Sequence, residues 1–434
     1  MNNQQLLELL RSEVVPAIGC TEPIAVALCV ARAKELLGSE PDEITVYLSK
    51  NVYKNALAVG IPNTGMTGLP IAIALGATVG KSKYLLEVLR DATPEAVAYA
   101  KEYMLRVPAN IRIDYDAPSI LYIHAELRKG DKVAQATIMD EHTKFVEKTS
   151  PKSSPKGKDF NTAQNTLPSR EGMGIGLNLR RVYDFAMEVD THDITFLKDG
   201  AEMNTAAAET SFADQYGHGL GRLLRANTLT ATPEMEKLFG NTLFTKIISY
   251  TCGACDARMS GAMVQVMSNS GSGNQGISCS IPVYLYAKEN NCNEEQTLRA
   301  LALSNLTVIY IKQSLGRLSA LCGCVVAATG SAAGITYLMG GNYEEITYAI
   351  KNMIANISGM ICDGAKPGCA LKVTSGVATA IFSAYLAMQH SFADSTEGIV
   401  EDDIDRTIRN LTRIGHDGMK VTDDLILDIM THKQ

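Results

Sequence analysis

The sequence ILYIHAELRKGDKVAQATIM, residues 120–139, alternates apolar and polar side chains on both sides of the dipeptide Lys129-Gly130. Alternation with a period of two is typical of half-buried strands, and Lys-Gly between two such runs predicts a tight turn. Residues 110–115 and 144–148 extend the pattern, and residues 43–49 show the same alternation. We therefore expect a small antiparallel sheet in the first part of the chain.

The rest of the chain has helical periodicity. Residues 3–15 form an amphipathic pattern, and from about residue 177 onward the sequence predicts almost only helices. Residues 151–170 are rich in Pro, Ser, Lys and Asn, which is typical of an exposed linker. The sequence thus predicts an α+β protein with an N-terminal lobe (residues 1–150), a linker (151–176) and a larger all-helical lobe (177–434), with the active site between the lobes.

Composition narrows the classes of function. The 434 residues carry a net charge of −7. This charge gives no indication of the basic surface that a nucleic-acid or acidic-membrane partner would require. Residues 318–343 are uncharged and long enough to span a bilayer, but they are dominated by Ala, Ser and Gly, which favours a buried helical hairpin. Residues 1–10 do not resemble a signal peptide, so we expect a cytoplasmic protein, in which ten cysteines indicate metal binding or catalysis rather than disulfides.

Two cysteines flank a Gly- and Pro-rich turn in the stretch Gly359-Met-Ile-Cys362-Asp-Gly-Ala-Lys-Pro-Gly-Cys369-Ala370. Core packing cannot fix such a loop, so a disulfide or a metal centre is expected to hold the two sulfurs. Cys322 lies beside a glycine at the start of the small-residue helix. Three cysteines from two loops could hold three irons of a [4Fe–4S] cluster and leave the fourth iron open for substrate.

A second candidate region is Gly19-Cys20-Thr21-Glu22-Pro23, which precedes an apolar helix. A cysteine just outside a helix N-terminus is favoured as a thiolate by the helix dipole and the free amides. The alternative is a small buried residue in a turn.

Two polar loops have the composition of small-ligand sites. The first contains Asn63, Thr64 and Gly65, and the second contains Ser270, Gly271, Ser272 and Asn274. A Gly/Ser run that opens a helix exposes N–H groups suited to a carboxylate or phosphate. An ordinary helix-start loop is the alternative for each.

These motifs together resemble the L-cysteine desulfidase family, which is related to the iron–sulfur L-serine dehydratases. The resemblance rests on residues 19–23, 268–276, 317–322 and 358–364 and covers essentially the whole chain. It implies a [4Fe–4S] lyase that converts L-cysteine to pyruvate, ammonia and hydrogen sulfide. By the same resemblance, Cys322, Cys362 and Cys369 take the places of the cluster ligands and Cys20 that of the reactive cysteine, with Cys324 as a rival ligand to Cys322.

Other functions stay open at this point. Nothing in the sequence separates a thiol from a hydroxyl leaving group, so an L-serine dehydratase-like lyase acting on another β-substituted amino acid is the first alternative. A pyridoxal-phosphate enzyme and a non-catalytic iron–sulfur or thiol sensor are the others. We expect a small amino acid as the substrate and a homodimer as the candidate assembly.

Overall fold

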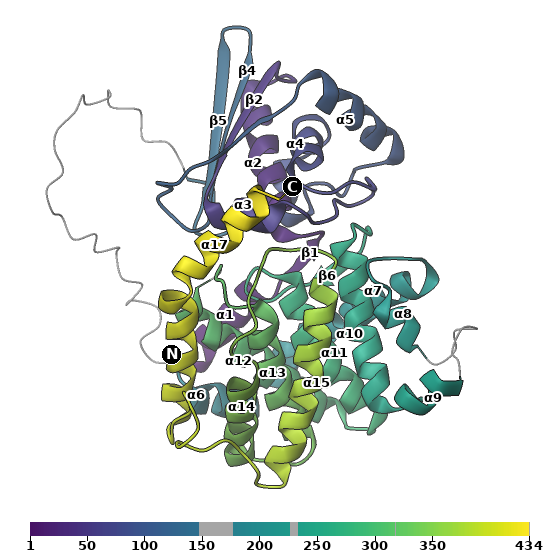
Figure 1. The fold of residues 1–434 in the computed structure, drawn as a ribbon, viewed down its shortest axis with the longest axis vertical. Coiled ribbons are helices and arrows are strands. Elements are labelled where there is room, and N and C mark those ends of the chain that lie inside the picture. Colours follow the sequence, from purple (N-terminus) through teal and green to yellow (C-terminus); the bar gives the residue numbers. More distant parts are fainter. Residues whose placement is uncertain (147–176, 226–232, 317, 434) are drawn as a thin grey trace, which may run out of the picture.

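The computed structural model describes residues 1–146, 177–225, 233–316 and 318–433, and it forms two lobes (Figure 1). The smaller lobe combines a sheet with helices, and the larger lobe is a bundle of helices. The predicted α+β class is therefore confirmed. The predicted linker, residues 151–176, lies outside the described residues.

The sheet of the smaller lobe has the strand order β3-β2-β4-β5. Its strands span Glu43–Leu48 (β2), Asn110–Ile113 (β3), Tyr122–Lys129 (β4) and Lys132–Met139 (β5). The β4–β5 hairpin turns at Gly130, whose φ of +55° suits glycine. β2 also pairs antiparallel with β4.

The prediction of a purely antiparallel sheet is wrong at one edge, because β2 and β3 are parallel. The chain between them forms the helices α3 (Lys50–Ala56), α4 (Leu69–Thr78) and α5 (Pro94–Arg106), with a 3₁₀ helix at Ser82–Glu87. A long helical crossover returns the chain in the same direction, which a tight hairpin cannot do. Of the strand predicted at residues 144–148, only a single bridge between Phe145 and Ile138 forms, and residues 147–148 lie outside the described part.

One face of this sheet is covered by helix α2 (Thr21–Leu37), with α4 packed against it. Nearly every side chain of α2 is buried, which its long run of Ala, Val, Ile and Leu explains. The first turn of α2, with Cys20 just before it, lies at the end that faces the larger lobe.

The larger lobe is built around the uncharged helix α13 (Gly323–Leu338), which contacts α11, α12, α14 and α15. Glycines allow these close approaches: a Cβ at Gly330 would lie 2.5 Å from the Ser304 carbonyl oxygen, and one at Gly334 would lie 3.0 Å from that of Ala300. The helices of this lobe are α6 (Leu179–Glu188), α7 (Phe196–Ala213), α8 (Leu220–Leu224), α9 (Pro233–Phe239), α10 (Leu243–Met259), α11 (Gly273–Glu289), α12 (Glu294–Leu315), α14 (Tyr343–Ile357), α15 (Cys369–Met388) and α16 (Ile404–Arg413).

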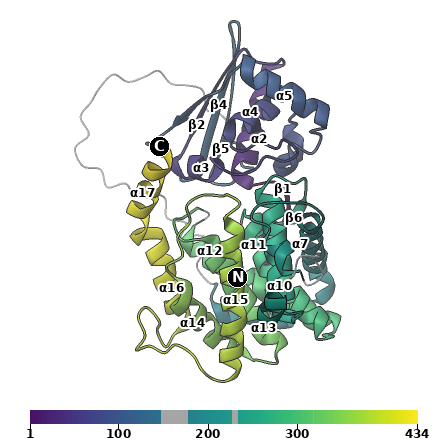
Figure 2. The same ribbon diagram turned by 45° about the vertical axis from the view of Figure 1, so that its right-hand side comes forward.

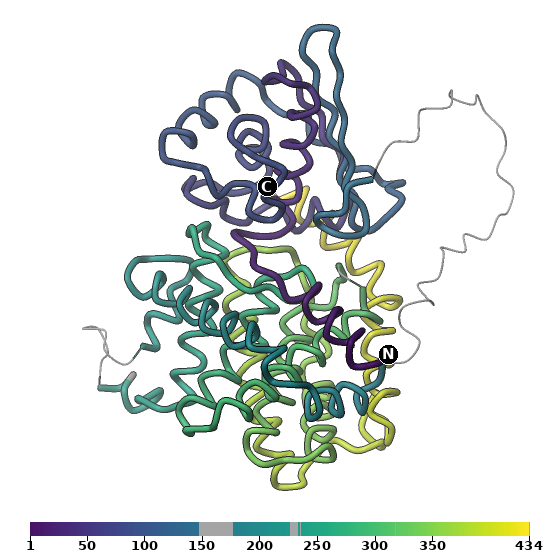
Figure 3. The backbone as a smooth tube through the Cα atoms, turned by 180° about the vertical axis from the view of Figure 1, so that it is seen from behind, coloured from purple at the N-terminus to yellow at the C-terminus, as the bar shows by residue number. Residues whose placement is uncertain are grey.

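The chain crosses between the lobes at both ends. Helix α1 (Asn3–Glu13) runs along the larger lobe, as Figure 3 shows from behind. Its side chains Leu6, Leu7 and Leu10 are buried in the core of that lobe. Strand β1 (Pro16–Ile18) then pairs with β6 (Gln265–Met267), so the larger lobe is not all-helical as predicted. Helix α17 (Lys420–Thr431) returns against α3 of the smaller lobe (Figure 2). Both terminal helices thus tie the lobes together.

One described helix, α15, is long and apolar enough to cross a membrane by length and composition. A single such helix is weak evidence, because core helices pass the same test, and 44% of its most apolar window is buried within the lobe.

Candidate active site

A pocket of about 100 Å³ lies where the two lobes meet. Pockets that take drug-sized ligands measure roughly 300–1,000 Å³, so this one suits a much smaller molecule. Its lining includes predicted site residues from both ends of the chain: Cys20, Ser272, Asn274, Cys322, Cys362 and Cys369.

Two of the predicted ligand cysteines are brought together by a short antiparallel contact. The Cys322 N–H donates to the Met360 carbonyl (2.9 Å), and the Cys362 N–H donates to the Ala320 carbonyl (2.6 Å). Cys369 begins α15 and lines the same pocket. Gly364, between Cys362 and Cys369, has a φ of +88°, and a Cβ there would lie 2.5 Å from the Lys54 carbonyl oxygen. The turn therefore needs glycine at this position.

Cys324 also lines the pocket, two residues from Cys322 at the start of α13. The neighbouring Cys324 thiol outweighs burial and lowers the pKa of Cys322 to about 7, while Cys322 and burial raise the pKa of Cys324 well above its ordinary value. Burial, followed by the charge of Cys322, raises the pKa of Cys362 to about 11. In the described part of the chain, no three His, Cys, Asp or Glu side chains are grouped closely enough for a single metal ion. In a [4Fe–4S] cluster each cysteine binds a different iron, so the ligand sulfurs lie further apart than the sulfurs around a single metal ion.

Cys20 does not have the environment that the sequence predicted. It is the residue before α2, but it is 3% exposed, and its thiol donates to the Glu22 Oε2 at 3.2 Å. Burial and the Glu22 carboxylate raise the pKa of Cys20 well above its ordinary value. The prediction of a lowered pKa is thus wrong, because burial and a neighbouring anion outweigh the helix terminus.

Glu22 is a pocket residue that sequence reasoning missed, although it lies in the motif. It also accepts hydrogen bonds from the Thr21 hydroxyl (3.0 Å) and the Asn55 Nδ2 (3.1 Å). Burial opposes its charge, but His142 and the bonds from Cys20 and Thr21 hold the pKa of Glu22 below its ordinary value. The pair therefore consists of a neutral thiol and a carboxylate.

The two predicted ligand loops differ in position. Ser272 and Asn274 line the pocket at the start of α11, but Ser270 and Gly271 form the turn before it and do not line it. Asn63, Thr64 and Gly65 form a separate tight turn, away from the pocket lining. In that turn the Thr64 hydroxyl donates to the Ile61 carbonyl at 2.8 Å and accepts from the Met66 N–H.

Several known proteins are similar to this chain in sequence. The serine dehydratase alpha chain family matches residues 83–428. The chain belongs to this family. UPF0597 proteins of Phocaeicola vulgatus and Bacteroides thetaiotaomicron are each 55% identical to it, over 431 and 430 residues, covering 99% of this chain and 98% of each relative. A UPF0597 protein of Porphyromonas gingivalis is 48% identical, covering 99% of both chains.

Membership of the serine dehydratase alpha chain family confirms the predicted relation to the serine dehydratases and points to an enzyme of the dehydratase or lyase type. The matched region contains the three predicted ligand cysteines and α11, whereas Cys20 and Glu22 precede it.

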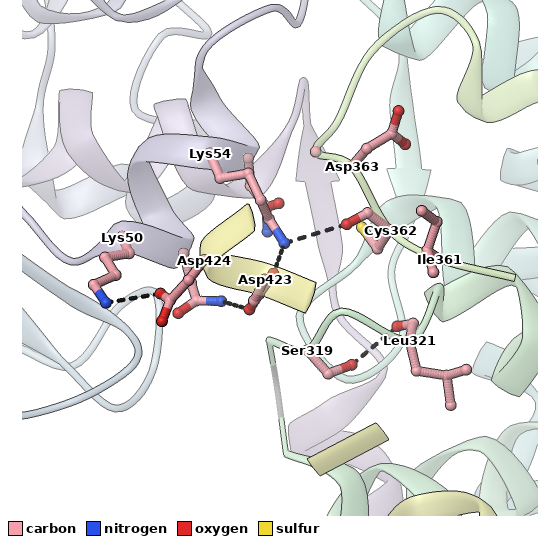
Figure 4. Close-up of polar contacts among 12 residues, drawn as sticks. Lys50, Lys54, Ser319, Leu321, Ile361, Cys362, Asp363, Asp423 and Asp424 are labelled. Carbon is pink, nitrogen blue, oxygen red and sulfur yellow. Dashed lines mark hydrogen bonds and ion pairs between the residues drawn. The ribbon is translucent and has the colours of Figure 1, made fainter. Parts of the chain in front are cut away.

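In this serine dehydratase relative, a buried lysine of the smaller lobe connects α17 to the loop of residues 359–369, which contains Cys362 (Figure 4). Lys54, on α3, is 2% exposed, forms an ion pair with Asp423 of α17 and donates to the Cys362 carbonyl at 3.3 Å. Asn51 donates to the same carboxylate, and Lys50 pairs with Asp424 at 2.7 Å. Three segments that are far apart in the sequence therefore meet beside Cys362.

Proposed function

We propose that the protein catalyses iron–sulfur-dependent β-elimination of L-cysteine to pyruvate, ammonia and hydrogen sulfide. The observation that carries the proposal is the convergence of Cys322, Cys362 and Cys369 on the pocket that also contains Cys20 and Glu22. Membership of the serine dehydratase alpha chain family supports the reaction type, because loss of a β-substituent from an amino acid is common to both reactions.

The residues present suit a [4Fe–4S] cluster. Cys322, Cys362 and Cys369 supply three thiols from two segments, and the pocket beside them is lined by polar side chains. A cluster with three cysteine ligands would supply an open iron as a Lewis acid for the leaving group. Cys324 is the rival of Cys322 as a ligand, because both residues line the same pocket.

The chain's own residues would move the proton. In the proposed step, the Glu22 Oε2 accepts the proton of the Cys20 Sγ, and the sulfur takes the proton from the substrate Cα. The electron pair of the Cα–H bond forms the Cα–Cβ double bond as the Cβ–S bond breaks and sulfide leaves. The resulting aminoacrylate tautomerises to an imine, which water hydrolyses to pyruvate and ammonia.

An L-serine dehydratase-like reaction is the second candidate, and the family match favours it. The two differ only in the leaving group. Anaerobically purified protein should contain iron and acid-labile sulfide and should release sulfide and pyruvate from L-cysteine faster than pyruvate from L-serine. Faster turnover of L-serine would select the alternative, and protein without iron that is inactive on both would overturn the proposal.

Substitutions test the assignments within the site. Single Ala variants of Cys322, Cys362 and Cys369 should lose iron and activity, whereas Cys29→Ala, buried against the sheet of the smaller lobe, should keep both. Cys20→Ser should keep the iron absorbance and lose a factor of about 10²–10⁴ in kcat, which is typical for removal of a general base. Full activity of Cys20→Ser would remove Cys20 from the mechanism.

We further propose that the protein acts in the cytoplasm as a homodimer, without a nucleic-acid or membrane partner. The net charge of −7 supports the absence of a nucleic-acid partner. Size-exclusion chromatography with light scattering tests the dimer.

A further inference from the structure

We propose that Arg258 binds the α-carboxylate of the substrate, and that the side-chain oxygens of Asn55 and Gln275 bind its α-ammonium group. The proposal deepens the proposed function and rests on it only in taking the pocket's ligand to be a small amino acid. It assigns recognition of the zwitterion to residues of this chain, independently of the leaving group.

Arg258 is a buried cation with unused hydrogen-bond donors. It lies in the last turn of α10, lines the pocket and is 2% exposed. Its Nη1 donates to the Asn274 Oδ1 at 2.9 Å, but its Nε and Nη2 have no hydrogen-bond partner in the described part of the chain. A buried charged group without partners is costly, so such donors are expected to serve a ligand.

The geometry of a guanidinium indicates what kind of ligand Arg258 binds. Two N–H groups of one guanidinium form a fixed fork that matches the two oxygens of a carboxylate. Within the described ranges the one hydrogen bond of the Arg258 guanidinium goes to a neutral amide, that of Asn274, so its positive charge is available for an anion. Arg258 and Cys20 line the same pocket, so the guanidinium lies on the same cavity as the proposed proton acceptor.

The start of α11 is shaped around this side chain. A Cβ at Gly273 would overlap the Arg258 Nε, so only glycine leaves room for the guanidinium there. Asn274, the next residue, holds the far side of the guanidinium through Nη1. Arg258 is thereby fixed in position while its Nε and Nη2 remain unoccupied.

Two buried acceptors complete the recognition of a zwitterion. Asn55 and Gln275 line the same pocket, and the buried Asn55 Oδ1 and Gln275 Oε1 have no donor among the described residues. Their orientations are set by their amide nitrogens, since the Asn55 Nδ2 donates to Glu22 and the Gln275 Nε2 donates to the Asn269 carbonyl. Gln275 also lies against Gly323, next to Cys322. An ammonium group offers the three donors that such oxygens need.

The test uses ligands that cannot react. L-alanine has the carboxylate and the ammonium but no leaving group, ethylamine lacks the carboxylate, and propionate lacks the ammonium. Calorimetric titration of anaerobic holoprotein should show wild type binding L-alanine at least about 10-fold more tightly than ethylamine, because hydrogen bonds to charged groups are the strong ones.

In Arg258→Gln this preference should fall to about 1, through weaker L-alanine binding with ethylamine binding unchanged. Arg258→Lys should fall between wild type and Arg258→Gln, because it keeps the charge but loses the fork. It is also the second variant if Arg258→Gln does not fold. Asn55→Ala and Gln275→Ala should weaken L-alanine binding and leave propionate binding unchanged. Arg180→Gln, at an exposed arginine of α6, is the matched control and should bind like wild type.

Equal binding of L-alanine and ethylamine by wild type would overturn the proposal. An equal loss for both ligands in Arg258→Gln and Arg258→Lys would also do so, because it would mark a purely structural role. Arg258-dependent binding of L-alanine by a protein that does not release sulfide from L-cysteine would support this inference and reject only the proposed reaction.

Discussion

The ion pair between Lys54 and Asp423 should hold helix α17 against the smaller lobe. In Asp423→Ala the Lys54 ammonium, 2% exposed, keeps the Cys362 carbonyl at 3.3 Å as its one hydrogen-bond acceptor among the residues that the structure describes. Removing one partner of a buried pair costs about 3–5 kcal/mol. We take the lower value, about 3 kcal/mol, because Asp423 is 18% exposed.

This cost should appear as local opening of α17 rather than as unfolding of a lobe, because few of its side chains are buried. Since 1.4 kcal/mol is a factor of ten, 3 kcal/mol corresponds to an opening equilibrium raised about a hundredfold. Hydrogen–deuterium exchange of the amides in residues 420–431 measures this change directly.

The neighbouring pair Lys50–Asp424 provides the control. Its side chains are 36% and 58% exposed, so Asp424→Ala should cost less than about 1 kcal/mol and raise exchange at most about fivefold. Lys54→Met combined with Asp423→Ala should recover part of the protection, because no buried charge is left. Wild-type protection in Asp423→Ala, or equal losses in the two single variants, would refute the reasoning.

Three further outcomes are expected. The pKa of Glu22 is lowered on folding, so its carboxylate stabilises the protein at neutral pH. This stabilisation is lost as the pH falls below about 4.5. In acid unfolding, the stability of Glu22→Gln should therefore fall less steeply with pH than that of the wild type. Gly364→Ala should lower stability by about 1–3 kcal/mol and reduce iron content, whereas Gly130→Ala, with open space around its Cβ, should lose less in thermal unfolding. Cys324→Ala should keep its iron if Cys322 is the ligand. Iron loss in Cys324→Ala but not in Cys322→Ala would show that Cys324, and not Cys322, is the ligand.

The strands at residues 122–129 and 132–139 were predictable because the sequence contains both signals, the period of two and the Lys-Gly turn. The parallel pairing of β3 was not, since side-chain alternation is the same in either direction. Strand direction is set by the crossover through α3, α4 and α5, which is a property of the chain path.

For the site, the sequence showed which loops have the composition of a ligand-binding loop, but it did not show which of these loops line the pocket. Ser272 and Asn274 line the pocket, but Asn63 to Gly65 has the same turn composition and lies elsewhere. Arg258 was missed, although an arginine within the apolar helix α10 was a usable signal. Its unpaired donors become visible only when α10, α11 and the pocket are placed together.

The sequence by itself determined the helical character of the larger lobe, the β4–β5 hairpin, the glycine turn at Gly364 and the cysteines available near it, because these depend on local period and on backbone freedom. Only the tertiary structure decided which thiols share a pocket and which carry a proton. Cys20 has the sequence context of a thiolate, yet burial and Glu22 keep it neutral, because a pKa depends on the groups and the water around the side chain and not on its neighbours along the chain.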